Sequence, residues 1–254
     1  MRALTRSMAV VTLLGACATT PAAYDDATFQ TMTSDGVVIA GERYFGGLGP
    51  DTPLILLFHQ GGSNGRGEYA PLVEWLNAEG YRAIAWDSRA GGDTYGESNR
   101  TVSALAPGVP NGYCDAYPDL QAALDHAISE DFADEVIVWG SSYSATLVFQ
   151  LAAKNSESVS AVLAFSPPSG GPLEPCLARE WVDTVEVPML LLRPGSEMER
   201  PSVVLQRDIL TAAGASFLLV PEGVHGSSML VDARTAAPME AYRVRVADWL
   251  ADNE

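Results

Sequence analysis

The sequence is poor in lysine, histidine and cysteine. Its 254 residues include one lysine (Lys154), three histidines and three cysteines, and 32 acidic against 15 basic residues give a net charge of −17. So little positive charge argues against a polyanionic partner such as nucleic acid. The chain also lacks internal repeats and low-complexity tracts. A composition of 47% hydrophobic and 19% charged residues therefore indicates one soluble enzyme domain with a buried core.

The first 23 residues have the pattern of a secretory signal peptide. Arg2 and Arg6 form a basic start, residues 8–14 are apolar, and small residues precede Cys17. The apolar run is too short to span a membrane. We therefore expect the mature chain to work outside the cytoplasm, with residues 24–254 forming the folded domain.

The tetrapeptide from Leu14 to Cys17 resembles a bacterial lipobox, in which the cysteine is lipidated and becomes the first residue. Loss of Arg2 and Arg6 would leave 13 basic and 32 acidic residues, a net charge of −19. Ordinary cleavage near Ala23, which discards Cys17, is the alternative. The lipobox predicts a lipoprotein of the cell envelope or periplasm that touches the membrane only through its lipid. The sequence leaves the oligomeric state open.

Cys114 and Cys176 remain in either case. Both lie in segments rich in glycine and proline, and an exported compartment permits disulfides. We expect the two to pair rather than to act as nucleophiles, because neither follows a strand in a sharp turn.

The hydrophobic pattern from residue 29 onward predicts an α/β fold. Two strands joined by a turn at 34–36 begin an antiparallel edge. Strands then alternate with helices, which implies a mostly parallel twisted sheet covered on both faces. The predicted strands are 53–58, 81–87, 136–139, 159–165, 188–193 and 216–220, and the predicted helices are 68–79, 116–130, 143–154, 202–213 and 238–252. Ligands of such sheets bind at the carboxyl ends of the strands.

The segment VWGSSYS contains three candidate nucleophiles directly after a strand. A nucleophile elbow needs small residues two before and two after its serine, since the strained turn brings strand and helix close together. Ser142 meets this condition with Gly140 and Ser144, whereas Ser141 follows Trp139 by two residues. The alternative is a serine-rich helix cap.

A serine hydroxyl needs a base, and in folds with this elbow the chain order is serine, acid, histidine. His225 is the only histidine after Ser142, and it follows a predicted strand. We expect His126 to be solvated, since it lies off the apolar stripe of its helix. Two carboxylates follow the strand at 188–193, and both Glu197 and Glu199 are candidates for the acid.

The segment FHQGGSN follows the strand at 53–58 and resembles an oxyanion-hole turn, although Gln60 stands where a glycine is usual. The expected donors are the backbone N–H groups of Gly61 and of Tyr143, the residue after the nucleophile. Gln60 is the alternative to Gly61. We expect His59 to hold its own loop and assign it no proton transfer.

Together, the segments VWGSSYS, FHQGGSN and GVHGSS resemble the α/β-hydrolase superfamily, nearest to dienelactone hydrolase-like and small bacterial serine esterases. In many such enzymes the acid stands ten residues after the start of a V-P-V-L-L-I-type strand, which favours Glu197 over Glu199. The resemblance implies a Ser-His-acid hydrolase without metal or organic cofactor. We expect it to cleave carboxylic esters or thioesters through an acyl-enzyme.

Two further functions stay open. One is a catalytically inactive binding lipoprotein of the envelope, and the other is a peptidase or acyltransferase with the same triad.

The predicted site has few elements to cover it. Only 22 residues separate the strand ending at 165 from the strand beginning at 188, which leaves room for one short helix instead of a helical lid. We expect an open site, with Tyr95 and the segment around Tyr113 as one wall. Arg89 follows a strand near this site, and pairing with nearby acids is the favoured role for its guanidinium over binding a substrate carboxylate.

Overall fold

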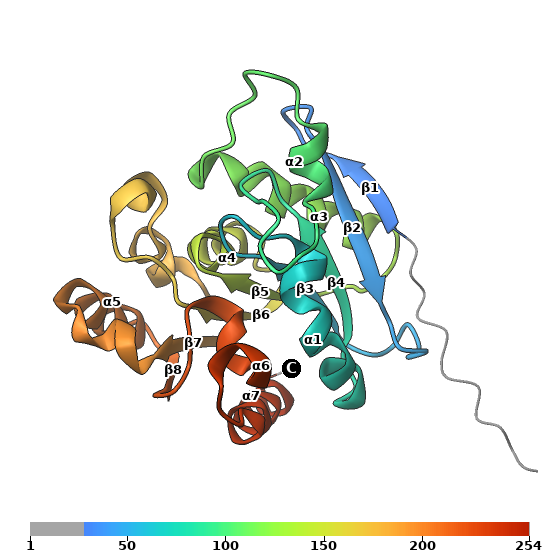
Figure 1. Cartoon of the computed structure of the whole chain (residues 1–254). Coiled ribbons are helices and arrows are strands. Elements are labelled where there is room, and N and C mark those ends of the chain that lie inside the picture. Colours follow the sequence, from blue (N-terminus) through green and yellow to red (C-terminus); the bar gives the residue numbers. More distant parts are fainter. Residues whose placement is uncertain (1–27, 254) are drawn as a thin grey trace, which may run out of the picture.

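A computed structural model describes residues 28–253, and its sheet has eight strands in the order β1-β2-β4-β3-β5-β6-β7-β8 (Figure 1). The strands are β1 (Thr28–Met32), β2 (Val38–Tyr44), β3 (Leu54–Phe58), β4 (Arg82–Asp87), β5 (Val136–Ser141), β6 (Val159–Phe165), β7 (Met189–Pro194) and β8 (Ser216–Val220). The first two form an antiparallel hairpin, and β2 also pairs antiparallel with β4. From β4 to β8 every pairing is parallel.

The helices form a layer on each side of the sheet. They are α1 (Gly65–Ala78), α2 (Arg100–Ala104), α3 (Tyr117–Ser129), α4 (Tyr143–Lys154), α5 (Pro201–Ala212), α6 (Asp232–Thr235) and α7 (Glu240–Asp252). Within residues 28–253, six short 3-10 helices lie in the connections: η1 (Cys114–Ala116), η2 (Gly171–Cys176), η3 (Ala178–Glu180), η4 (Val182–Thr184), η5 (Gly195–Glu199) and η6 (Gly226–Leu230).

The period-two alternation of strand side chains creates two cores. Along β3, Leu54 and Leu56 pack with α3 and α4, whereas Ile55 and Leu57 pack with α1 and α7. All five side chains of β3 are fully buried because helices cover both faces. The predicted α/β-hydrolase architecture is thus confirmed, with β5 and its elbow at the centre of the sheet.

Two element predictions need correction. Helix α1 begins at Gly65 instead of residue 68, because the Asn64 side chain caps it by accepting a hydrogen bond from Gly67 N at 2.7 Å. The segment 90–112, in which no helix or strand is predicted, contains the short helix α2, whose first turn is capped by Asn99. In both cases a side-chain cap starts a helix in a segment whose glycines or polar residues predict a loop.

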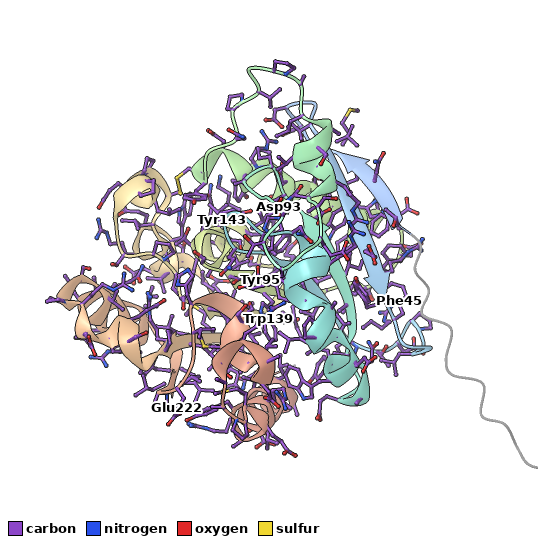
Figure 2. All side chains as sticks on the ribbon, in the orientation of Figure 1. Phe45, Asp93, Tyr95, Trp139, Tyr143 and Glu222 are labelled. Atoms are coloured by element: carbon purple, nitrogen blue, oxygen red, sulfur yellow. A yellow bond between two sulfur atoms is a disulfide. The ribbon has the colours of Figure 1, made fainter. Side chains whose placement is uncertain are left out.

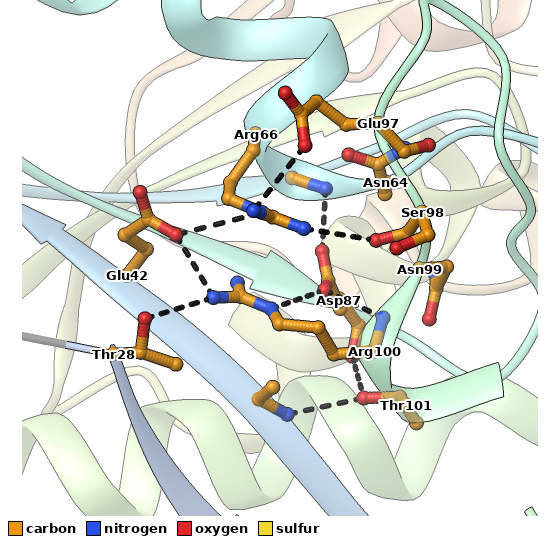
Figure 3. Close-up of polar contacts among 12 residues, drawn as sticks. Thr28, Glu42, Asn64, Arg66, Asp87, Glu97, Ser98, Asn99, Arg100 and Thr101 are labelled. Carbon is orange, nitrogen blue, oxygen red and sulfur yellow. Dashed lines mark hydrogen bonds and ion pairs between the residues drawn. The ribbon is translucent and has the colours of Figure 1, made fainter. Parts of the chain in front are cut away.

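Charged side chains fix the segment after β4 against the sheet (Figure 3). Asp87, at the end of β4, accepts hydrogen bonds from Gly65 N and from Nε of Arg100, both at 2.8 Å. Arg100 also pairs with Glu42 on β2 at 2.8 Å. Thr101 donates to the Asp87 carbonyl oxygen and accepts from Ala40 N. These contacts hold the start of α1, and therefore the loop that precedes it, in a fixed place.

The prediction that His126 is solvated was wrong. Its ring is half-buried and stacks on Phe29, with ring centroids 4.8 Å apart, and it meets Trp86 and Phe132 edge-on. The antiparallel edge formed by β1 places Phe29 over α3, and sequence periodicity within α3 carries no information about this partner.

The connection between β6 and β7 contains only η2, η3 and η4, so no helical lid is inserted there. Cys114 and Cys176 form a disulfide that ties η1 to η2, with Cα atoms 5.8 Å apart and a sequence separation of 62. The disulfide therefore joins the two connections that follow β4 and β6.

Removal of this disulfide is expected to lower the free energy of unfolding by up to about 4 kcal/mol, because the closed loop is long and the cross-link restricts the unfolded chain. Urea unfolding of the Cys114→Ser/Cys176→Ser variant and of the reduced wild type measures the loss. Unchanged unfolding midpoints in both proteins would contradict the expectation.

The predicted signal segment, including Cys17, lies outside the described residues. Within residues 28–253, no helix is both long enough and apolar enough to cross a membrane.

Candidate active site

The turn from β5 into α4 holds Ser142 in a strained backbone conformation. Its φ of 57° and ψ of −120° are rare for a residue with a side chain and persist only where the surroundings impose them. Gly140 makes the turn possible, since a Cβ there would lie 2.5 Å from the Ser144 carbonyl oxygen. The segment therefore has the geometry of a nucleophile elbow with Ser142 at its tip.

The other two serines of the elbow are fully buried and hold the turn together. The Ser144 hydroxyl accepts from Ser141 N at 2.8 Å and donates to the Phe58 carbonyl oxygen at 2.7 Å. The Ser141 hydroxyl accepts from Ser227 N at 2.9 Å. Only the Ser142 side chain is partly exposed. The buried hydroxyl of Ser144 thus links strand and helix at the position where the pattern usually has glycine.

The structure brings His225 and Glu197 together. Glu197 Oε1 lies 2.5 Å from His225 Nδ1, and the Glu197 side chain is 4% exposed against 50% for His225. This contact places the ring proton on Nδ1 and leaves the Nε2 lone pair free to accept a proton. Glu199, two residues on, is exposed. Of the two candidate acids, Glu197 is the one in contact with the histidine.

A buried arginine keeps Glu197 ionised. Arg193 Nη1 donates to Glu197 Oε2 at 2.7 Å, and the other Arg193 amino group bonds the Pro167 carbonyl and Gln206 Oε1. Burial raises the pKa of Glu197, but the hydrogen bond from His225 and the charge of Arg193 outweigh it and hold that pKa below its usual range. The carboxylate can therefore stabilise an imidazolium on His225 at neutral pH.

Backbone hydrogen bonds tie the loop carrying His225 to the elbow. Gly226 N donates to the Ser166 hydroxyl at 3.1 Å, and Ser227 N donates to the hydroxyl of Ser141, the neighbour of Ser142. The Ser227 hydroxyl accepts from Trp139 Nε1 at 2.8 Å. Trp139 and Tyr143, labelled in Figure 2, flank the elbow along the chain. The arrangement brings the segments of the predicted serine, histidine and acid to one edge of the sheet.

The expected oxyanion donors are the backbone N–H groups of Gly61 and Tyr143. Tyr143 is the first residue of α4, so its N–H has no carbonyl partner within the helix. Gln60 N donates to Glu68 Oε2 at 2.7 Å and is therefore occupied, which favours Gly61 over Gln60. A Cβ on Gly61 would lie 2.7 Å from the Tyr113 ring. A side chain at Gly61 would therefore require the Tyr113 ring to shift.

His59 is buried and holds the loop of residues 59–64, which is the expected oxyanion loop. Its Nδ1 lies 2.8 Å from the Gln60 carbonyl oxygen, and its Nε2 accepts from Ser88 N at 2.9 Å. A ring that donates from Nδ1 and accepts at Nε2 is neutral. Burial lowers the pKa of His59, which keeps the ring neutral. The geometry gives His59 a structural place in the loop.

Two hollows open beside these groups. One, of about 460 Å³, is lined by Gly62 of the oxyanion loop and by Tyr113, which stacks on Tyr143 at 5.1 Å between ring centroids. The other, of about 490 Å³, is lined by His225 and Glu197.

Tyr113 forms a wall as expected, and it precedes the disulfide-bonded Cys114. Tyr95 instead contacts Gln60 and Ser228 through its hydroxyl.

Arg89 is committed to acidic partners. Its guanidinium is 1% exposed and pairs with Asp119 at 2.8 Å and Asp35 at 2.5 Å. The preferred expectation of acid pairing is confirmed, because both acids contact the Arg89 guanidinium. Among residues 28–253, no group of three or more His, Cys, Asp or Glu side chains is placed to hold a metal ion.

Sequence reasoning missed Glu68, which is fully buried and contacts the oxyanion loop. An acidic residue in the first turn of a helix is ordinarily solvated and interacts with the helix dipole. The residue type and position of Glu68 therefore do not indicate a role in the site. Only its burial distinguishes it from such a residue.

The fold, the strained elbow and the His–Glu contact define an α/β hydrolase. Residues 50–210 match the family described as serine aminopeptidase, S33, and the chain belongs to this family of serine hydrolases. The match spans the oxyanion loop, the elbow and the candidate acid, and it ends before His225. None of the curated proteins matches this chain in sequence.

Solved structures share the fold at low identity. An esterase of Pyrococcus furiosus is 17% identical, with a TM-score of 0.64 over 90% of this chain and 91% of its own. A Klebsiella pneumoniae protein assigned to the dienelactone hydrolases is 18% identical, with a TM-score of 0.66 over 89% and 98% of the two chains. The acylaminoacyl peptidase of Pyrococcus horikoshii is 14% identical, with a TM-score of 0.63 over 89% of this chain and 41% of its own. The resemblance to dienelactone hydrolase-like proteins and esterases is confirmed at the level of fold.

Proposed function

We propose that the protein is a carboxylesterase that cleaves small esters or thioesters through a triad of Ser142, His225 and Glu197. The observation that carries this proposal is the 2.5 Å contact between Glu197 and His225, in a loop that bonds to Ser141, the neighbour of a serine held at a φ of 57°. A buried ionised acid, an oriented histidine and a partly exposed, strained serine are the parts that acyl transfer requires.

In this mechanism His225 Nε2 takes the proton of the Ser142 hydroxyl as its oxygen attacks the ester carbonyl carbon. The carbonyl oxygen becomes negative and is held by the N–H groups of Gly61 and Tyr143. When the tetrahedral intermediate collapses, His225 returns the proton to the leaving alcohol or thiol. Water then attacks the acyl-enzyme with His225 again as base, which releases the acid and restores Ser142.

His225, as the general acid, must reach the leaving oxygen or sulfur atom of the substrate. The two hollows therefore have different roles. The leaving group would lie on the side of the 490 Å³ hollow, which His225 lines. The acyl group would then extend toward the 460 Å³ hollow, where Tyr113 and the disulfide form the wall. Both volumes suit small substrates.

A panel of 4-nitrophenyl esters tests this proposal against the alternatives. We expect kcat/KM for the acetate and butyrate to exceed that for the dodecanoate by at least about tenfold, since a small walled hollow gains little from a long chain. An amino-acid 4-nitroanilide is the peptidase control, and transfer to an added alcohol is the acyltransferase control. Preference for the anilide, or for the longest chain, would contradict the proposal. No turnover of any substrate would favour a binding protein.

We further propose that the protein works in an oxidising compartment outside the cytoplasm. The Cys114–Cys176 disulfide supports this, because such bonds rarely persist among cytoplasmic thiols. A lipid on Cys17 would be detected as a mass increase on the N-terminal peptide of protein isolated from membranes, and an unmodified peptide beginning after Ala23 would exclude it.

A further inference from the structure

Glu68 is a carboxylate with 0% exposure that lies beneath the oxyanion loop. We propose that Glu68 is a positioning residue, which fixes the Gly61 N–H toward the oxyanion by holding the preceding peptide unit. The inference rests on the proposed esterase function. It assigns Glu68 no contact with substrate and no proton transfer.

The direct contact is a charge-assisted hydrogen bond. Gln60 N donates to Glu68 Oε2 at 2.7 Å across eight residues of chain, so the first turn of α1 reaches back to the loop that follows β3. Such bonds to a carboxylate are stronger than neutral ones. Because the group is buried, water cannot replace it as the acceptor for this N–H.

The consequence for Gly61 follows from peptide planarity. Glu68 fixes the peptide between His59 and Gln60, and His59 Nδ1 fixes the next one through the Gln60 carbonyl oxygen at 2.8 Å. In a trans peptide the C=O and N–H point in opposite directions. A Gln60 carbonyl held on the His59 side therefore aims the Gly61 N–H the other way. Two successive peptide units are locked, one by each buried side chain.

The Gln60 side chain adds a brace that a glycine could not provide. Its Nε2 donates to the Tyr95 hydroxyl at 3.0 Å, which lies 2.8 Å from the Ser228 hydroxyl in η6. Tyr95 is labelled in Figure 2. Gln60 thus connects the oxyanion loop to the segment that follows His225. This contact gives a physical reason for glutamine at a position where the pattern usually has glycine.

Arg234 completes the arrangement around Glu68. Its guanidinium donates to the backbone carbonyl oxygens of Glu68 and Gly67 and lies 3.7 Å from the centroid of the Tyr95 ring. Burial raises the pKa of Glu68 to about 6, and the Ser141 hydroxyl, the Gln60 N–H and the charges of Arg234 and His225 favour the ionised form. Glu68 is thus ionised above pH 6, at a cost in folding stability. A buried charge kept at such a cost beside a candidate site points to a functional role.

The test compares three variants with 4-nitrophenyl butyrate at pH 8. Glu68→Met keeps the length of the side chain and removes the acceptor, and Glu68→Gln retains an acceptor oxygen without the charge. Glu79→Gln is the control, because Glu79 is exposed at the opposite end of α1 from Glu68. Active-site titration normalises kcat to the folded protein, and thermal unfolding gives Tm.

We expect Glu68→Met to lower kcat about 30-fold and to leave KM within about threefold of the wild-type value. This loss is smaller than the loss that follows complete removal of an oxyanion donor. Binding of a trifluoromethyl ketone, which forms the tetrahedral adduct, should weaken by the same factor. Glu68→Gln should recover most of kcat, and neither variant should have a lower Tm than Glu79→Gln.

A normalised kcat for Glu68→Met equal to that of the Glu79→Gln control would overturn the inference, and the proposed function would stand. A change in KM alone, or in the folded fraction alone, with normalised kcat unchanged would also overturn it, because a merely structural role predicts that result. A wild type without esterase turnover would overturn both the inference and the function on which it rests.

Discussion

Replacement of Ser142 by alanine is expected to lower kcat for a short-chain 4-nitrophenyl ester by at least about 10⁴-fold and to leave the fold intact. The loss is large because no other group in the site can form the acyl-enzyme. The fold should survive, since the Ser142 side chain is partly exposed and the buried hydroxyls of Ser141 and Ser144 hold the turn. Steady-state kinetics and thermal unfolding measure the two effects.

Ser129→Ala is the control for this experiment. Ser129 is exposed at the end of α3, and its hydroxyl contacts only a carbonyl oxygen of its own helix. It should match wild type in kcat and Tm. If Ser142→Ala retained more than a few per cent of wild-type turnover, another nucleophile would be required and the proposed mechanism would be wrong.

The second large effect is expected at Glu197. Glu197→Gln should lower kcat by about 10²- to 10⁴-fold, because an amide does not stabilise the imidazolium and can hold the ring in the wrong tautomer. Glu199→Gln is the matched control, two residues away and exposed, and it should leave kcat unchanged. The same assay that measures Ser142→Ala measures both variants.

Glu197→Gln should also destabilise the protein, unlike Ser142→Ala. It leaves the buried Arg193 guanidinium without its carboxylate partner, and such losses cost about 3–5 kcal/mol. Because the folded-state pKa of Glu197 is lowered, its contribution to stability is present above the ordinary carboxyl pKa and is lost as pH falls through the folded-state pKa. Urea unfolding at pH 7 tests the first effect. A larger kcat loss in Glu199→Gln than in Glu197→Gln would reverse the assignment of the acid.

Much of the candidate site could be predicted because it depends on local rules. A serine between small residues at a strand-to-helix turn can be recognised from five positions, and the order of strands places His225 and the acid at the same sheet edge. The choice of Glu197 rested on counting along a strand, and the structure places that side chain against His225.

The features missed depend on tertiary contacts instead. The stacking of Phe29 on His126 arises from the antiparallel edge strand, and the burial of Glu68 arises from packing of α1 beneath the oxyanion loop. Neither leaves a periodic signal in the sequence. Gln60 could be recognised as a departure from the pattern, but its partner Tyr95 lies 35 residues away in the long connection after β4.

The central claim, that Ser142 is a nucleophile activated by His225, is tested most directly by intact-protein mass spectrometry after treatment with a fluorophosphonate. The account predicts one adduct on the wild type, none on Ser142→Ala, and much slower labelling of His225→Ala. Folded wild type that gains no mass, or a Ser142→Ala variant that labels like wild type, would contradict it.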